Sequence, residues 1–174
     1  LAALYGAYAQ DRPSPLPALP IQYADFAHWQ RQWLSGDVLA QQLDYWTGQL
    51  AGAPALLALP TDRPRPAVQR YRGALHPFTV SRETTAALHA LDAQAQTTLF
   101  MTLAAAFNVL LSTYSGQSDI CIGTAIANRN RAEIEPLIGF FVNTLVLRTH
   151  IEPELGFEAL LQHVRATTLD AYAH

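Results

Sequence analysis

The sequence contains only one cysteine in 174 residues, so the chain cannot form an internal disulfide. Cys121 lies in the apolar run "DICIGTAIA", where we expect a small buried hydrophobic side chain. Because there is no second cysteine and the six histidines are scattered, no zinc ligand set is available. A lone cysteine is typical of a reducing compartment. We therefore expect a cytoplasmic protein without a structural metal.

Charge and long apolar runs are also scarce. Charged residues make up 14% of the chain, the formal net charge is −3, and no basic run reaches five residues. Binding to nucleic acid needs a basic face, so nucleic acid is not the expected partner. The longest mainly apolar stretch, residues 99–111, is shorter than the roughly 20 residues of a membrane span. It is apolar nearly all round, which predicts a core helix buried on most sides.

Familiar catalytic motifs are missing. The sequence has no G-x-G-x-x-G, P-loop, G-x-S-x-G or H-E-x-x-H. Asp25 and His28 stand three residues apart, as do His89 and Asp92, but neither pair has an evident orienting group. We expect Asp25 and His28 to be a solvated pair, and His89 to lie on a solvated helix face.

What the sequence does contain is enough apolar material for a core, since half of its residues are hydrophobic. The length suits one domain or a large piece of a bigger one. Both ends read as helix, so we expect the chain to be part of a longer protein. Strands and helices alternate along the chain, which favours a mixed α/β sheet with packed helices.

The expected elements follow from apolar periodicity, caps and breakers. Two proline-rich connectors cover 11–20 and 51–72. The two later strands are nearly continuous apolar runs, as expected for strands covered on both faces. Pro77 places the first strand at an edge or a bulge. The last helix should bury Leu160, Leu161, Val164 and Leu169. The predicted helices are 1–8, 21–34, 39–50, 82–95, 98–114 (beginning at a Thr97 or Thr98 cap) and 157–172, and the predicted strands are 74–80, 119–127 and 140–151.

Polar residues interrupt the last apolar strand. Asn143 and Thr144 divide "FFV" from "LVL", and Arg148 follows. A buried amide must find hydrogen bonds, so Asn143 either ties neighbouring backbone together or faces a cleft. The arginines of "NRNR" (128–131) and Arg148 either lie at the mouth of a channel or in water.

Several stretches together resemble the condensation domains of nonribosomal peptide synthetases. "YADFAHW" (23–29) resembles the Y-x-D-F-A-x-W motif of that family, and "IGFFVNTLVLR" (138–148) resembles its I-G-x-F-V-N-T motif with the trailing arginine. "LPTDRPRP" (59–66), "YSGQSDICIGTAIANRNR" (114–131) and the terminal "AYAH" are also similar to that family. The resemblance covers essentially the whole chain, in the family's order.

The resemblance implies a chloramphenicol-acetyltransferase-like fold with two α/β lobes around a tunnel. Residues 1–50 would complete the N-terminal lobe, 51–72 would connect the lobes, and 73–174 would form a truncated C-terminal lobe. The implied reaction is peptide-bond formation between thioesters held on the phosphopantetheine arms of donor and acceptor carrier proteins. No cofactor would bind the chain directly. The implied partners are the carrier proteins, the rest of the condensation domain and an adenylation domain.

The family's catalytic motif, H-H-x-x-x-D-G, is absent from this sequence. The resemblance therefore implies no catalytic residue in this chain and no condensation by the chain alone. Trp29, Asn143 and Arg148 match motif positions, and we expect them, with Asp25 and Thr144, to support the tunnel or the lobe interface. "YADFAHW" would then be a packing helix, in which Trp29 braces and His28 occupies a variable position.

Other interpretations stay open. An epimerization or cyclization relative would share the scaffold and run different chemistry. A non-catalytic lobe that only docks carrier proteins belongs to a different functional class. A stand-alone acyltransferase using coenzyme A is less favoured, because nothing in the sequence reads as a nucleotide site.

Overall fold

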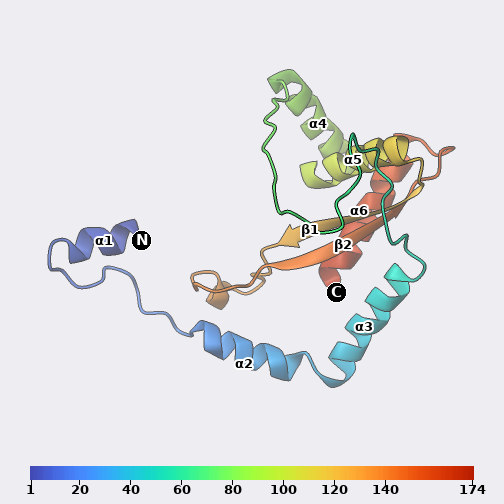
Figure 1. Ribbon diagram of the computed structural model, residues 1–174. Coiled ribbons are helices and arrows are strands. Elements are labelled where there is room, and N and C mark those ends of the chain that lie inside the picture. The colour runs from blue at the N-terminus through green and yellow to red at the C-terminus, as the bar shows by residue number, and fades with distance from the viewer. The chain divides into compact units, whose positions relative to one another are not determined.

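The computed structural model describes residues 1–174 and forms two compact units (Figure 1). The first unit comprises Leu1–Gln41 with Ile126–Asn143, and the second comprises Gln42–Ala125 with Thr144–His174. The elements in chain order are α1 (Ala2–Tyr8), α2 (Tyr23–Trp33), α3 (Gly36–Leu50), α4 (Arg82–Ala95), α5 (Leu99–Ser115), β1 (Asp119–Ile126), the 3-10 helix η1 (Ala132–Ile134), β2 (Asn143–His150) and α6 (Phe157–Ala173).

Three helices build the core of the second unit. Figure 1 shows α4, α5 and α6 gathered beside the strand pair, and their contacts bury Met101, Ala105, Leu161 and Val164. The helix ends are set by capping, as the sequence predicts. The side chains of Ser81 and Thr98 accept hydrogen bonds from the first turns of α4 and α5. α5 ends at Gly116, whose φ of 69° is a left-handed conformation that favours glycine.

Polar bonds reinforce this core. The side chain of Asp92 is buried and accepts a 2.5 Å hydrogen bond from Thr102 Oγ1, whereas His89 is exposed, as expected. The bond joins α4 to α5. Asn108 of α5 is also buried and donates from Nδ2 to Thr149 Oγ1 of β2, at 3.2 Å. Helix and strand are thus joined by hydrogen bonds inside the apolar packing.

β1 and β2 form a two-stranded sheet. They run antiparallel, since the Ile151 N–H bonds the Ser118 carbonyl at one end and Thr144 lies beside Gly123 at the other. Alternate residues of β2 are buried: Leu145, Leu147 and Thr149. The expectation that both strands are covered on two faces is wrong for β1, where only Ile120 is buried.

Arg148 joins three segments of the second unit. Its Nε and Nη2 atoms donate to the two carboxylate oxygens of Asp119, at 2.9 and 2.7 Å. Its Nη1 atom donates to the carbonyls of Gln49 and Ala51, at 3.0 and 2.8 Å. The fork geometry of guanidinium matches a carboxylate bidentately, so one side chain fixes β2 against β1 and against the end of α3.

The predicted strand at 74–80 is absent, because residues 51–81 contain no helix or strand. Pro77 has no N–H to donate to a ladder, and no other strand lies beside this segment. Its apolar side chains are exposed, with Leu75 at 99% and Phe78 at 81%. An apolar run alone therefore does not make a strand without a partner for its backbone.

α5 is also less covered than its composition predicts. An apolar stripe at helical spacing is 40–63% exposed: Phe100, Leu103, Phe107, Leu110 and Tyr114. Leu169 of α6, expected in the core, is 45% exposed, whereas Leu160, Leu161 and Val164 are buried as expected. No single helix is both long and apolar enough to span a bilayer; α4 and α5 reach that length only together, across a 103° bend.

The first unit has its own aromatic core. Phe26 of α2 packs with Ile134, Leu137 and Phe141. The Tyr23 hydroxyl donates to the Phe140 carbonyl at 2.9 Å, and its ring meets Phe141 edge-on at 5.1 Å. Phe26 is the buried side chain of α2, whereas Trp33 at the end of the helix is exposed.

Thr102→Val should lower the free energy of unfolding by about 1–3 kcal/mol, because the buried Asp92 carboxyl loses its short hydrogen bond. The measurement is chemical denaturation followed by circular dichroism. Thr113→Val is the matched control, since Thr113 lies exposed on the same helix. Equal losses in the two variants would contradict a special role for the Asp92 bond.

Gly139→Ala should destabilise the first unit, because an added Cβ would fall inside the ring of Tyr23. Overpacking of this kind costs about 1–3 kcal/mol. Near-ultraviolet circular dichroism and thermal unfolding would report the loss of aromatic packing. Gly6→Ala is the control, since a Cβ there meets nothing within 4 Å. Unchanged near-ultraviolet signal in Gly139→Ala would show that Tyr23 does not occupy this position.

Stability should fall more steeply in acid for the native chain than for Asp119→Asn. The Arg148 guanidinium hydrogen-bonds the carboxylate and holds the pKa of Asp119 below its ordinary value. A carboxylate with a lowered pKa stabilises the fold above its ordinary pKa of about 3.9, and the stabilisation disappears as pH falls through the lowered value. Urea unfolding between about pH 6 and pH 2 tests this. Parallel profiles for the two proteins would contradict it.

Candidate functional site

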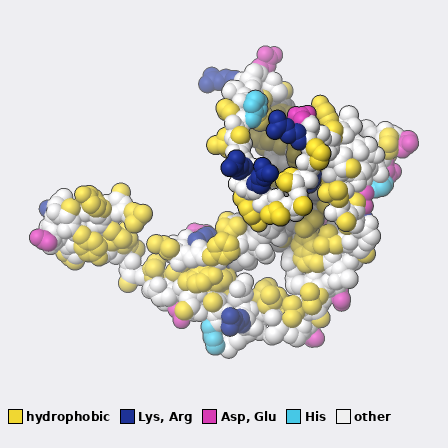
Figure 2. Space-filling model, viewed as in Figure 1, with side chains coloured by type: hydrophobic (Ala, Val, Ile, Leu, Met, Phe, Trp, Pro, Cys, Tyr) yellow, Lys and Arg dark blue, Asp and Glu magenta, His cyan; other side chains and the backbone are white.

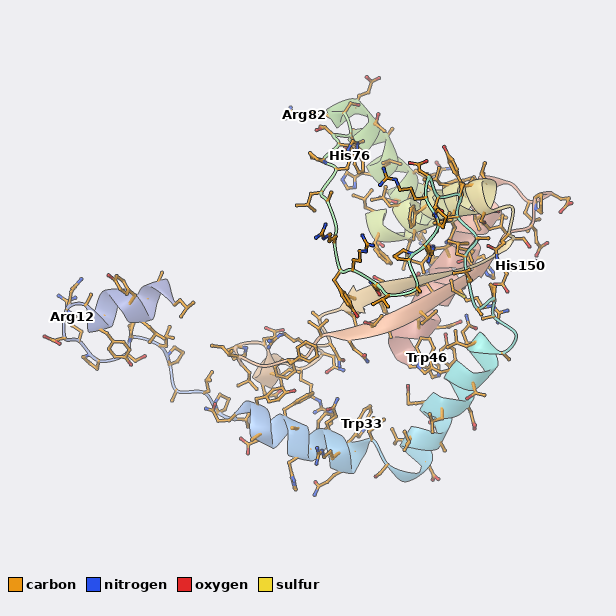
Figure 3. The ribbon with its side chains drawn as sticks, in the orientation of Figure 1. Arg12, Trp33, Trp46, His76, Arg82 and His150 are labelled. Atoms are coloured by element: carbon orange, nitrogen blue, oxygen red, sulfur yellow. The ribbon has the colours of Figure 1, made fainter.

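A polar pocket of the second unit surrounds Arg148. It has a volume of about 480 Å³. The end of α3, the first residue of β1, the end of β2 and one side of α6 all contribute to it. Figure 3 shows His150, one of its lining residues, at the end of β2. The pocket is lined by Gly48, Gln49, Asp119, Arg148, His150, His163, Ala166, Thr167 and Asp170.

Arg148 is a structural cation in this pocket. All three of its nitrogen atoms already donate hydrogen bonds within the chain, and hydrogen bonding to Asp119 raises the pKa of Arg148. The guanidinium therefore shapes the wall of the pocket and keeps few donors for a ligand. Nearby, burial raises the pKa of the Cys121 thiol and Asp119 raises it further, while Arg148 opposes the shift. A thiol with a raised pKa is a poor nucleophile.

His174, at the last position, stacks on Tyr45 of α3. The two rings lie 3.9 Å apart at 7°. The His174 Nδ1 atom lies 2.9 Å from the carbonyl of Asp170. Burial, followed by the charge of Asp170, raises the pKa of the Tyr45 hydroxyl. The sequence could not assign a role to this histidine; in the structure it packs against α3.

A second, mainly apolar pocket belongs to the first unit. Its volume is about 280 Å³. Trp29 forms one wall, stacked on Trp33 at 5.4 Å and 13°. The guanidinium of Arg131 lies 4.4 Å from the centre of the Trp29 ring, which is a cation–π contact. The lining residues are Ile21, Asp25, Phe26, Trp29, Arg131, Glu133 and Ile134.

The "NRNR" arginines have structural partners in the same unit. Arg129 donates from Nη1 to the carbonyls of Ile134, Glu135 and Leu137, at 2.6–3.2 Å. Its guanidinium also lies 4.1 Å from the ring centre of Phe141. The sequence left two positions open for these arginines, the mouth of a channel or water. Neither describes Arg129, since its hydrogen bonds hold a loop together.

The structure brings only two of the predicted site residues together. Trp29 and Asp25 line the first-unit pocket, although the Asp25 carboxylate is engaged by the Gln22 backbone N–H at 2.8 Å in a capping box. Asp25 does not pair with His28, which instead lies 3.0 Å from Gln32. Arg148 belongs to the pocket of the second unit.

Asn143 and Thr144 lie at the start of β2 and line neither pocket. Both are exposed, so the premise of a buried amide at Asn143 is wrong. The apolar letters on either side made this position look interior, but the strand begins only at Asn143. The apolar residues before Asn143 belong to a loop of the first unit.

Sequence reasoning missed Asp119 as a site residue, and it missed the contact of Arg131 with Trp29. Asp119 opens an apolar strand, and a lone carboxylate beside such a run is a signal for a cross-strand partner. Arg131 could not be paired with Trp29 from spacing, because the two residues lie far apart in the chain. Within residues 1–174, no group of three or more His, Cys, Asp or Glu side chains could hold a metal ion.

The residues that line the two pockets can bind and orient a ligand, but they include no evident catalytic group for making a covalent bond. Neither pocket presents a nucleophile hydrogen-bonded to a base that is itself oriented by a third group. The polar pocket offers two histidines and fixed charges, and the apolar pocket offers an indole face.

Comparison with known proteins agrees with this geometry. The family model described as Condensation domain matches residues 1–174. One of the linear gramicidin synthase subunits of Brevibacillus parabrevis is 56% identical over 174 residues, which is 100% of this chain and 2% of that protein. Malpinin synthetase of Mortierella alpina is 49% identical over 174 residues, again 100% of this chain and 2% of that protein. The chain therefore spans a small part of these curated relatives.

Solved structures are similar over the whole chain. The X-domain in its complex with OxyB from teicoplanin biosynthesis matches with a TM-score of 0.90 at 28% identity, over 99% of this chain and 39% of that one. A four-domain nonribosomal peptide synthetase matches with a TM-score of 0.85 at 26% identity, over 99% of this chain and 13% of that one.

The expected chloramphenicol-acetyltransferase-like fold is confirmed by these structural relatives. The motif "YADFAHW" contributes Asp25, Phe26 and Trp29 to the apolar pocket, and "IGFFVNTLVLR" contributes Arg148 to the polar pocket. Since the family model covers all 174 residues, the chain belongs to the condensation domain family found in nonribosomal peptide synthetases.

Proposed function

We propose that this chain is the part of a condensation domain that supports peptide-bond formation between aminoacyl or peptidyl thioesters. In that reaction the acceptor amine attacks the donor thioester carbonyl. The observation that carries the proposal is the bidentate Arg148–Asp119 pair, placed by the "IGFFVNTLVLR" motif at the wall of a polar pocket. A rigid wall positions a reacting group, and positioning alone supplies several kcal/mol of a barrier.

In this proposal residues 1–174 position the reacting groups, and groups outside these residues transfer the proton. The H-H-x-x-x-D-G motif is absent, so the chain alone would not form peptide bonds. Arg148 would act as a positioning residue, through its bonds to Asp119 and to the end of α3. Trp29, held between Trp33 and Arg131, would brace its own pocket in the same way, with Asp25 fixing the start of α2.

Asn143 and Thr144 would support the tunnel between the two lobes of the full condensation domain. Both side chains are exposed at the start of β2. The substrates would arrive on phosphopantetheine arms of donor and acceptor carrier proteins, so the chain would need no cofactor of its own. The remaining part of the condensation domain and an adenylation domain would be its neighbours in the synthetase. Epimerization or cyclization on the same scaffold would need different residues at the missing motif.

A non-catalytic docking module is the second candidate. It is favoured by the lack of a nucleophile–base pair in either pocket and by a structural relative, the X-domain, solved in complex with OxyB. In this case the exposed apolar surface would recruit a partner, and no amide bond would form. The two candidates differ in whether the full-length protein makes product.

The test is a condensation assay on the full-length synthetase with preloaded carrier proteins, analysed by mass spectrometry. Arg148→Lys should lower the rate of amide formation at least about tenfold, because lysine keeps the charge but loses the bidentate fork. Thioester loading of the carriers should not change. Arg12→Lys is the matched control, since Arg12 is an exposed arginine of the other unit.

Two results would contradict the proposal. Native protein that binds loaded carriers but forms no amide would identify a docking module. Normal turnover in Arg148→Lys, with unchanged thermal unfolding, would show that the Arg148–Asp119 pair does not position the reacting groups.

A further inference from the structure

The connector before α4 carries a concentration of positive charge. All 11 basic residues of the chain are arginines, and five of them lie between positions 63 and 82. That segment contains no carboxylate, so the rest of the chain has 6 arginines against 14 carboxylates, a net charge of −8. Figure 2 shows dark-blue side chains gathered over this region, and Figure 3 places Arg82 at the start of α4 beside it.

Three of these arginines share one pocket. Arg65, Arg70 and Arg72, with Pro66, Gln69 and Tyr71, line a cavity of about 540 Å³. No carboxylate contributes to its wall. The three side chains are exposed and make no hydrogen bond or ion pair with the rest of residues 1–174. This distinguishes them from Arg129 and Arg148, whose donors are occupied by the chain itself.

The backbone holds this cluster in an unusual conformation. Tyr71 has a φ of 51°, in the left-handed region that bulky residues rarely adopt. Pro66, which also lines the pocket, has its φ fixed by its ring. Strained residues such as Tyr71 concentrate at ligand-binding sites, where surrounding structure maintains them. Arg70 and Arg72, on either side of Tyr71, line the same pocket as Arg65.

We propose that Arg65, Arg70 and Arg72 form a binding site for the phosphate group of a ligand. Each guanidinium presents a fork of N–H donors that matches a phosphate bidentately, and three forks around one cavity suit a tetrahedral oxyanion. A single carboxylate would leave most of these donors unused. A nucleic acid is disfavoured, because the remaining surface is acidic and would repel an extended polyanion.

The proposed site shares no lining residue with the pocket of Arg148. For a phosphorylated small molecule the inference goes beyond the proposed condensation function, and for a substrate arm it rests on that function. Two sources could supply the phosphate: a phosphate monoester on a small molecule, or a phosphodiester within a substrate arm. The two differ in charge, since the monoester carries about −1.5 to −2 at pH 7 and the diester −1. Affinity for simple mono- and diesters therefore separates them.

The experiment is isothermal titration calorimetry of the protein with inorganic phosphate, phenyl phosphate and dimethyl phosphate. We expect saturable binding of at least one of them, weakened at least about tenfold in the Arg70→Gln/Arg72→Gln variant, since two charge-assisted hydrogen-bond donors are lost. Arg70→Lys, which keeps the charge without the fork, should fall between the native protein and that variant. Arg12→Gln is the matched control and should stay within about twofold of native, because exposed charges contribute little.

Preference for phenyl phosphate supports the site and identifies a phosphorylated small molecule; preference for dimethyl phosphate supports it and identifies a substrate arm. Circular dichroism checks that the exposed substitutions leave the fold intact. The proposal is overturned if none of the three compounds binds. It is also overturned if Arg12→Gln weakens binding as much as the double variant does, or if the protein binds only an oligonucleotide.

Discussion

The Arg148 side chain joins both strands of the second unit to the end of α3. Its guanidinium satisfies both oxygens of Asp119 and two carbonyls at the end of α3, so a single residue fixes two strands and a helix end. The sheet has only two strands and little apolar cover on β1, so it has few other contacts to set its register. The polar pocket exists because this pair forms one of its walls.

Around this pair, the chain divides its apolar residues between a packed core and exposed surface. The three-helix contact buries the side of α5 that carries Met101 and Ala105. The opposite stripe, from Phe100 to Tyr114, is exposed, as are Leu75 and Phe78 in the connector. This chain spans only 39% of the X-domain chain that it matches, and a larger domain would supply more surface for such a stripe to pack against.

The sequence was most informative where structure is decided locally. Ser81, Thr98 and Gly116 set helix ends through their own backbone neighbours, and these ends were predicted to within a residue. It was least informative where structure depends on a distant partner. The run at 74–80 has the composition of a strand but lacks a neighbouring strand. The hydrogen bond that Asp92 accepts could not be predicted, because its donor, Thr102, belongs to another helix.

In the candidate site, too, local motifs could be recognised from the sequence, whereas contacts with distant residues could not. The ordered motifs indicated the family, and they drew attention to Trp29 and Arg148. The partners that explain those two residues, Arg131 and Asp119, lie far away in the chain, and periodicity carries no information about such pairs. Asn143 was misread because the apolar residues before it belong to a loop rather than to the strand.

Hydrogen exchange, followed by mass spectrometry, in native protein and in Arg148→Gln tests directly whether Arg148 organises the sheet. We predict faster exchange in both strands and at the end of α3, while amides of the α5–α6 core keep their protection. Exchange that is unchanged in the strands, or that rises equally everywhere, would show that Arg148 does not organise the sheet and the pocket beside it.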